Sequence, residues 1–245
     1  MLRLPRNAPP RMKICALGIP QLVVGRHNVK DPRLDAADRL VEAKKKTYVQ
    51  VDVVGEDALS TADVFVVAPE RRPDLLLQDL EFVETRLGRT PSEVERSALL
   101  KLKAALEQDR SAAEAALSPD ERQAMAVHAG LLTARPLVVA TPEELERPEL
   151  LVLRAYAAAG YISFLTVGGK ENRAWMIRKG ATAWEAAGVI HSDIQRGFIR
   201  AEVISYDDLI AYGGETGAKR AGKQRLEGRD YVVQDYDVMH FRFNK

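Results

Sequence analysis

The sequence is poor in the residues that build disulfide frameworks and metal centres. Its 245 residues contain one cysteine, Cys15, so no intramolecular disulfide can form, and no CxxC or paired Cys/His spacing indicates zinc. No run approaches the roughly 18 apolar residues that a membrane-spanning helix needs. These absences are typical of a protein of the reducing cytoplasm. With 46% hydrophobic residues, the chain can still bury an ordinary core.

The sequence also lacks the loop that grips phosphates in many nucleotide hydrolases. That loop, GxxxxGK[ST], needs two glycines so that backbone amides converge on the anion, then a lysine and a hydroxyl at fixed offsets. Counting from Gly18, which follows an apolar run, places Val23, Val24 and Gly25 at the three required positions. All three residue types are wrong, so the sequence predicts no phosphate cradle here.

Charge is unevenly distributed, although the formal net charge is only +1. Residues 1–46 carry 11 Lys/Arg against 4 Asp/Glu, residues 47–150 carry 11 against 20, and residues 151–245 carry 14 against 11. The basic ends permit contact with a polyanion but do not require it, because most charged side chains only solvate a surface.

Hydrophobic periodicity predicts an α/β body in the first two thirds of the chain. Continuous apolar runs such as residues 62–69 are typical of strands buried on both faces of a parallel sheet. Further strands are expected at 13–18, 47–55 and 134–141, and helices at 31–46, 74–108 (broken near Thr90-Pro91), 118–132 and 143–159. Residues 1–11, rich in Arg and Pro, are expected to form a flexible leader.

From residue 160 onward the pattern changes to short strands and short helices. Strands are expected at 161–167 and 172–178 around a GGKE turn, then a helix at 182–190, a strand at 197–206, a helix at 206–214, and strands at 231–234 and 238–243. The order β-β-α-β-α-β-β within about 85 residues fits a small β-grasp domain, which we expect over 160–245.

Two long stretches of this last part resemble a known family. The runs from Arg173 to Gly214 and from Ala218 to Asn244 are similar to the C-terminal TGS domain of the YchF family, the Obg-like ATPases. The resemblance implies a β-grasp fold, and TGS domains are generally associated with RNA or ribosome contacts.

The remaining parts resemble a shortened version of the same family's N-terminal region. The similar segments are MKICALGIP, DPRLDAADRLV, VQVDVVG, LLLQDLEFVETRL, LLKLKAALE and LLTARPLVVATPEE. The resemblance implies a reduced P-loop-NTPase-like parallel sheet over 12–159, with a helical arm at about 74–109. The sequence runs almost directly from Gly18-Ile19-Pro20 into Asp31-Pro32, so the phosphate loop, its helix and the first switch are missing from this pattern.

The resemblance leaves a weak remnant of a nucleotide site. Asp52 and Gly55 match the family's DxxG motif, Gly18 matches the loop entry, and Thr141 stands where a base-reading asparagine is expected. A turn after a strand explains Asp52 and Gly55 equally simply, and we favour that interpretation because the cradle is absent.

Basic residues of the TGS-like part are the candidates for RNA binding. They are Arg173, Arg178, Lys179, Arg196, Arg200, Lys219, Arg220, Lys223, Arg225 and Arg229. The alternative for each is an ordinary solvated loop face. Core positions are expected for Trp175 and Trp184, and structural roles for His27, His128, His191 and His240. No nucleophile and base stand in a readable pattern, so no catalytic or metal-binding residue is assigned.

The sequence therefore predicts a cytoplasmic, non-catalytic YchF-like protein without a cofactor that binds structured RNA or the ribosome through its TGS domain. We expect neither a membrane nor a specific DNA partner. One alternative is weak binding of ATP or GTP with magnesium, and slow hydrolysis, through the remnant residues. Another is a protein-interaction module in which the helical arm contacts a partner.

Overall fold

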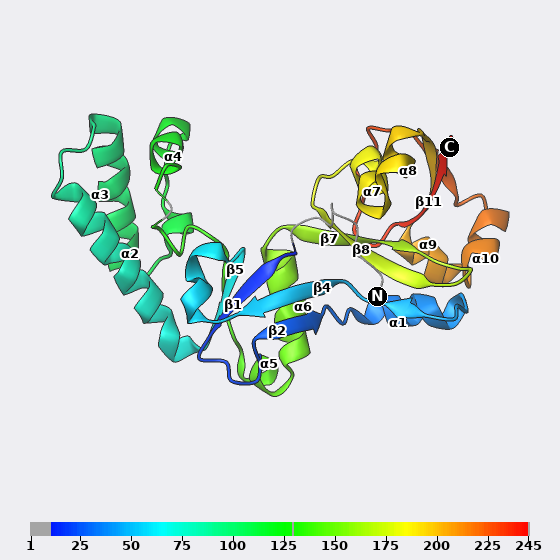
Figure 1. Ribbon diagram of the computed structural model, residues 1–245, viewed down its shortest axis with the longest axis horizontal. Helices are drawn as coiled ribbons and strands as arrows, with labels where there is room; N and C mark the ends of the chain where they lie inside the picture. Colours follow the sequence, from blue (N-terminus) through cyan, green and yellow to red (C-terminus); the bar gives the residue numbers. More distant parts are fainter. Residues whose placement is uncertain (1–10, 129, 245) are drawn as a thin grey trace. The chain divides into compact units, whose positions relative to one another are not determined.

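The structure is a computed structural model, and it describes residues 11–128 and 130–244. The contacts within it divide the chain into two compact units. We call residues 12–26 and 52–159 the arm unit, and residues 27–51 and 160–244 the C-terminal unit (Figure 1). Most of the expected leader, residues 1–10, lies outside the described residues.

A sheet with the strand order β2-β4-β1-β5-β6 organises the arm unit. Its strands are β1 (Lys13–Leu17), β2 (Gly25–Asn28), β4 (Gln50–Val54), β5 (Val64–Val67) and β6 (Leu137–Val139). Strand β1 pairs in parallel with β4 and β5, and β5 pairs in parallel with β6. All four residues of β5 are buried, as its unbroken apolar run predicts.

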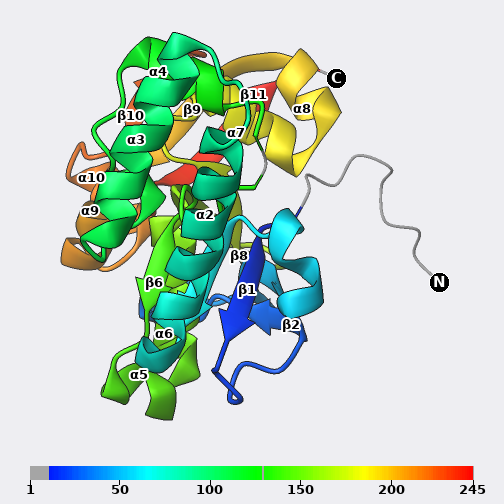
Figure 2. The ribbon, with the colours of Figure 1, turned by 90° about the vertical axis from the view of Figure 1, so that its left-hand side faces the viewer.

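Three helices build the arm of this unit, α2 (Arg72–Leu87), α3 (Glu93–Glu107) and α4 (Pro119–Met125), which lie side by side in Figure 2. The side chain of Ser92 caps α3, and Ser118 forms a capping box with Glu121 at the start of α4. The buried carboxylate of Asp79 accepts hydrogen bonds from the backbone amides of residues 132 and 133, at 2.6 and 2.8 Å. These contacts fasten α2 to the chain that leads back to the sheet.

The helix expected over 143–159 is two helices, α5 (Pro142–Glu146) and α6 (Pro148–Ala158). Pro148 explains the division, because proline has no amide hydrogen to donate and disfavours a helical conformation in the residue before it. The helix expected over 118–132 ends at Met125. Short 3-10 helices, η1 (Glu56–Thr61), η2 (Pro69–Arg71) and η3 (Ala112–Glu114), complete the unit.

A six-stranded sheet with the order β10-β9-β11-β7-β8-β3 forms the C-terminal unit. The strands are β3 (Lys46–Thr47), β7 (Tyr161–Thr166), β8 (Asn172–Arg178), β9 (Phe198–Ile204), β10 (Arg225–Glu227) and β11 (Val238–Phe243). Helix α7 (Ala183–Ile190) packs its alanines against one face, in a core that contains Phe164, Val203 and Met239.

The other helices of this unit are α1 (Pro32–Leu40), α8 (Ser192–Arg196), α9 (Tyr206–Ala211) and α10 (Glu215–Arg220). Helices α8 and α10 and strand β10 were not predicted, because segments of three to six residues carry too little periodicity to read. The strand expected over 231–234 does not form as such. Val232 makes an isolated bridge to Thr182, and the surrounding residues form a loop.

Residues 27–51 group with the C-terminal unit, whereas the sequence-based boundary placed them in the N-terminal body. Strand β3 pairs in parallel with β8, and the side chain of Asn172 donates hydrogen bonds to Asp38 Oδ1 and to the carbonyl of Val41. The Val41 contact lies immediately beyond Leu40, where α1 ends, six residues before the predicted end.

No helix among the described residues is long and apolar enough to cross a membrane.

Candidate functional site

The structure brings three of the four remnant nucleotide residues to one edge of the arm-unit sheet. Gly18 follows β1, Gly55 follows β4 and Thr141 comes two residues after β6, all at the carboxyl ends of strands. This edge is where open α/β sheets bind ligands. Asp52 lies inside β4 instead, where it pairs with Lys13 at the start of β1, so it is three residues from the edge.

Residues 18–24, which follow β1 at this edge, form a turn without a helix. The amide of Leu22 donates to the carbonyl of Ile19 at 3.0 Å, and both side chains are buried. A phosphate cradle requires successive amides and a helix N-terminus directed at the anion. The next helix along the chain, α1, starts only at Pro32 in the C-terminal unit.

Arg71 lies against the glycine that would open such a loop. Gly18 has a φ of +69°, and a Cβ atom built on it would lie 2.8 Å from Cγ of Arg71. The guanidinium of Arg71 contacts Asp74 Oδ2 at 2.5 Å and Glu56 Oε1 at 3.2 Å. Two carboxylates already hold this cation, so the edge beside Gly18 presents neither open space nor an unpaired positive charge.

Gly55 and Thr141 have local structural roles. The carbonyl of Gly55 accepts hydrogen bonds from the amide of Ala58 and from the thiol of Cys15. Burial raises the pKa of the Cys15 thiol to about 11, with the nearby Glu56 carboxylate adding to the effect. Thr141 caps α5 through a capping box with Glu144, with amide-to-oxygen distances of 2.9 and 3.3 Å.

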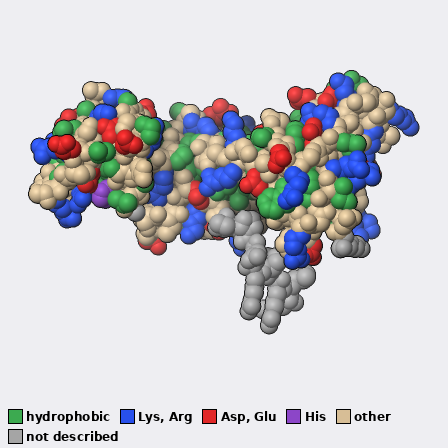
Figure 3. All heavy atoms as spheres, turned by 90° about the horizontal axis from the view of Figure 1, so that it is seen from above, with side chains coloured by type: hydrophobic (Ala, Val, Ile, Leu, Met, Phe, Trp, Pro, Cys, Tyr) green, Lys and Arg blue, Asp and Glu red, His purple; other side chains and the backbone are tan. Residues whose placement is uncertain are grey.

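The ten candidate RNA-binding cations are spread over the C-terminal unit. In the space-filling view of Figure 3, Lys and Arg side chains on this part alternate with acidic ones and do not form one block. Most of the ten have internal partners, so the structure separates the cations that already contact an acidic or aromatic side chain from those that do not. Among the described residues, Lys179, Arg200 and Arg220 are exposed and have no ion pair.

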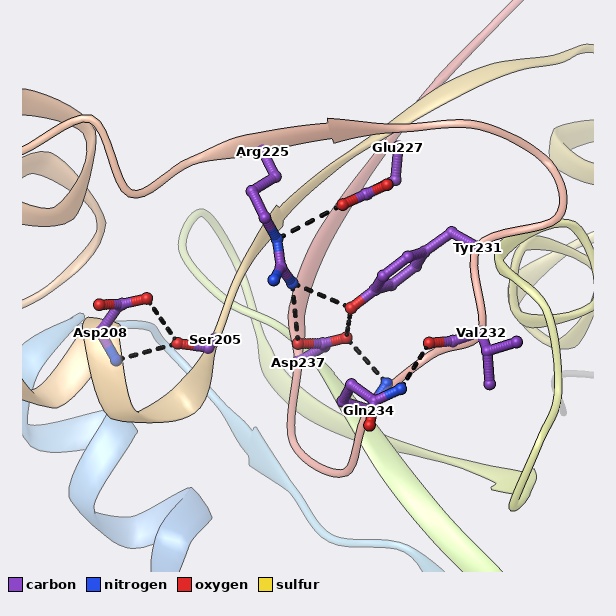
Figure 4. Close-up of polar contacts among 8 residues, drawn as sticks. All are labelled: Ser205, Asp208, Arg225, Glu227, Tyr231, Val232, Gln234 and Asp237. Carbon is purple, nitrogen blue, oxygen red and sulfur yellow. Dashed lines mark hydrogen bonds and ion pairs between the residues drawn. The ribbon is translucent and has the colours of Figure 1, made fainter.

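Arg225 is the clearest example of a cation with an internal role. It contacts Glu227 at 3.4 Å, the buried Asp237 at 3.7 Å and the hydroxyl of Tyr231 at 2.9 Å (Figure 4). Tyr231 and the amide of Gln234 also donate to Asp237. Burial raises the pKa of Asp237 despite these donors. The network organises the loop between β10 and β11.

Several other candidates stack on aromatic rings. Arg173 lies 3.9 Å from the ring centroid of Trp175, Arg178 lies 3.8 Å from that of Tyr161, and Arg229 lies 5.1 Å from that of Trp184. Such cation–π contacts stabilise the side chains in place. Arg196 pairs with Asp193, Lys223 with Asp208, and Lys219 with Glu215. Contacts within the protein thus account for the positions of seven of the ten basic side chains, and none of these contacts involves RNA.

The tryptophans and histidines are held by local contacts. Trp175 stacks on Phe164 and its indole donates to Thr166, while Trp184 is half-buried beside α8. His191 caps α8, where its Nδ1 accepts from the amide of Asp193. His128 contacts Glu95 at 3.0 Å, and His240 contacts Glu215 at 2.6 Å. Among the described residues, no group of three or more His, Cys, Asp or Glu is arranged to hold a metal ion.

The C-terminal unit also contains a pocket that sequence reasoning did not identify. Its volume is about 770 Å³, and it lies between the β7–β8 turn, strands β9 and β11, and α10. The charged groups of its lining are Lys170, Glu171, Glu202, Glu215, Lys219, His240 and Arg242. These residues come from four separate segments, so only the strand register could have brought them together.

The family comparisons match the C-terminal part of the chain. Residues 161–244 match the family model YchF-GTPase_C, described as a protein of unknown function (DUF933). Over 102 residues, 41% of this chain, the sequence is 60% identical to the ribosome-binding ATPase YchF of Haemophilus influenzae. It is 57% identical over 94 residues to the protein of the same name from Bacillus subtilis. These alignments span 28% and 26% of the two relatives, so the chain matches little more than a quarter of their length.

A solved structure is similar over nearly the whole chain. The Schizosaccharomyces pombe YchF GTPase superposes with a TM-score of 0.72, covering 99% of this chain and 100% of that one, at 19% sequence identity. At that identity the likeness concerns the fold. The sequence match over residues 161–244 confirms the resemblance of that part of the chain to the YchF C-terminal domain, and the solved structure shows a shared fold over nearly the whole chain.

Proposed function

We propose that this protein is a non-catalytic YchF-like factor that binds the ribosome or structured RNA through its C-terminal unit. The observation that carries the proposal is a contrast between the two units. Identity of 57–60% to two ribosome-binding ATPases runs through the C-terminal unit, while Arg71 lies against Gly18 at the strand edge where a nucleotide would bind. On this proposal the C-terminal unit is a TGS domain of the β-grasp class, and the protein acts in the cytoplasm.

The lack of a cradle supports the non-catalytic part of the proposal. Each charge-assisted hydrogen bond to a phosphate contributes about 1.5–3 kcal/mol. The arm unit has neither the lysine nor the converging amides, so it cannot make several of these hydrogen bonds. Micromolar affinity for a triphosphate is therefore not expected. The pair formed by Arg71 and Glu56 adds a carboxylate next to the same edge, which disfavours an anion there.

Ribosome co-sedimentation at low and moderate salt tests the binding part. We expect the full chain to pellet with ribosomes at low salt and to be released as salt rises, because phosphate contacts exchange with counterions. A variant with Lys179, Arg200 and Arg220 replaced by alanine should pellet less. The matched control replaces Arg89, Arg96 and Arg122, three exposed cations of the arm unit that have no ion pair among the described residues.

Three outcomes are informative. Salt-sensitive pelleting that falls with the C-terminal variant and not with the control supports the proposal. No pelleting of the wild-type chain at any salt contradicts it. Equal loss with the arm-unit control would favour contact through the helical arm, where Leu77, Leu100 and Val127 are 62%, 52% and 80% exposed.

The competing function is a residual nucleoside triphosphatase. It is favoured by the parallel sheet and by the fold shared with a YchF GTPase, with Gly18 and Gly55 still at adjacent strand ends. Calorimetry with ATP and GTP in the presence of magnesium separates the two functions. Binding at micromolar concentrations by the wild-type chain, or turnover by the pure protein, would overturn the non-catalytic assignment.

A further inference from the structure

The lining of the pocket in the C-terminal unit balances three Lys or Arg side chains against three Glu, but its charges are not evenly paired. Each glutamate of its lining already has a cation. Glu171 contacts Lys45 at 3.1 Å, Glu202 contacts Arg242, and Glu215 contacts His240 at 2.6 Å and Lys219 at 4.0 Å. Lys170 in the lining, and Arg200 outside it, are exposed and, within the described part of the chain, have no ion pair.

The strand register places Arg200 on the sheet face that carries part of the pocket lining. In the antiparallel pair of β9 and β11, Arg200 lies directly opposite Arg242, and Glu202 lies directly opposite His240. Residues opposite one another project from the same face of a sheet, so Arg200 shares the pocket face with Glu202, His240 and Arg242. Like charges directly opposite destabilise a sheet, and an anion bound between them would remove that cost.

The carboxylates of the pocket remain ionised acceptors. Burial acts to raise the pKa of Glu202, but the hydrogen bonds from Arg242 and Gln224 and the charges of Arg242 and Lys219 outweigh it, and the pKa is lowered. Glu202 can therefore accept hydrogen bonds from hydroxyl groups. The pocket is a depression open to solvent, and its volume of about 770 Å³ is far larger than one phosphate.

We propose that this pocket binds one nucleotide, with its phosphate against Lys170, Arg200 and Arg242 and its sugar hydroxyls near Glu202 and Glu215. The inference rests on the proposed function in taking the nucleotide to be part of an RNA strand. A free nucleoside monophosphate offers the same chemistry and is the alternative source. Exposed cations beside carboxylates match a ligand that is anionic at one end and rich in hydroxyl donors at the other.

The test uses the full chain and two probes, a fluorescein-labelled 12-nucleotide poly(A) RNA and AMP. The variants are Lys170→Ala and Arg200→Ala, both at exposed side chains whose loss leaves no unpaired partner. Each should weaken RNA binding roughly three- to tenfold and lower the slope of log affinity against log salt by about one. Lys30→Ala is the matched control, since it removes an exposed cation of the same unit that lies outside the pocket lining and is not among the RNA-binding candidates.

Each result decides a separate question. Weaker RNA binding by both pocket variants, with the control unchanged, supports an RNA nucleotide in the pocket. If AMP binding depends on Lys170 and the RNA does not bind, the RNA-strand inference is overturned and the pocket takes free nucleotides, while ribosome pelleting decides the proposed function separately. If both pocket variants bind both probes as wild type does, or the control loses as much as they do, the pocket inference is overturned. Ribosome pelleting by those variants would then leave the proposed function standing.

Discussion

The side-chain amide of Asn172 donates a hydrogen bond to Asp38 Oδ1 at 2.7 Å, joining residues 134 positions apart in the sequence. The same amide donates to the carbonyl of Val41, and Asn172 Oδ1 accepts from the amide of Gly168. Asn172 is fully buried. One side chain therefore ties the segment after α1 and the β7–β8 turn to the sheet of the C-terminal unit.

Replacing Asn172 should destabilise the C-terminal unit strongly. Asn172→Ala removes three hydrogen bonds, leaves the half-buried amide of Gly168 and carbonyl of Val41 without this partner, and leaves Asp38 with Lys46 as its one partner among the described residues. Each lost hydrogen bond of this kind costs about 1 kcal/mol. We expect a loss of about 3 kcal/mol in the free energy of unfolding, measured in urea. The control is Asn28→Ala, whose exposed side chain accepts from Gln50 at 3.2 Å and should matter by less than about 0.5 kcal/mol. Equal effects of the two variants would show that the buried contacts are not decisive.

Gly18→Ala tests the close approach of Arg71. Gly18 and Gly169 both have a φ of +69°, where an alanine costs about 1–2 kcal/mol. A Cβ on Gly18 would also meet Arg71 Cγ at 2.8 Å and Ala68 Cβ at 3.1 Å, whereas one on Gly169 would meet nothing within 4 Å. Chemical denaturation should therefore rank Gly18→Ala as clearly less stable than Gly169→Ala. Matching losses would mean that Arg71 moves away without cost.

Substitutions at Thr141 distinguish a helix cap from a base-reading position. Thr141→Ala should cost about 1 kcal/mol of stability, because the amide of Glu144 loses its acceptor. Thr141→Asn keeps a good cap and restores the family's residue type, so stability should stay within a few tenths of a kcal/mol. Thermal unfolding checks the stabilities, and calorimetry with GTP should detect no gain for Thr141→Asn. A gain in GTP affinity would count for a surviving base site.

The arm should weaken in acid through Glu121. The ammonium of Lys101, the amide of Ser118 and the hydroxyl of Ser97 lower the pKa of Glu121 to about 2 from a usual value of 4.5. A carboxylate with a lowered folded-state pKa stabilises the fold fully above the unfolded-state value, and this contribution is lost as the pH falls from about 4.5 towards 2. The protection factors for amide hydrogen exchange in α4, which correct for the intrinsic pH dependence of exchange, should fall over that range.

Glu121→Gln is the comparison for this acid effect. It removes the titrating group while keeping the shape of the side chain, so protection factors in α4 should be lower at pH 7 than in the wild-type protein and should change less between pH 4.5 and 2. If the wild-type protein and the variant show the same pH profile, another carboxylate controls the arm.

Local chemistry explains what could be predicted along the chain. The unbroken apolar run of β5, the periodic helices α2 and α3, and the Ser-Pro-Asp start of α4 are short-range signals, and the structure has these elements. The predicted helix bounds that differ from the structure have both local and non-local causes. Pro148 divides a predicted helix, and docking of the segment after Leu40 onto Asn172 accompanies the early end of α1.

The sequence by itself determined the missing phosphate cradle, the acidic middle and basic ends, and the resemblance of residues 161–244 to the YchF C-terminal domain, because these depend on residue types and their spacing. Only the tertiary structure decided which cations have internal partners, that residues 27–51 join the C-terminal unit, and that Arg200 lies opposite Arg242 in its sheet. Those properties depend on strand register and long-range hydrogen bonds, which bring together residues that are distant in the sequence.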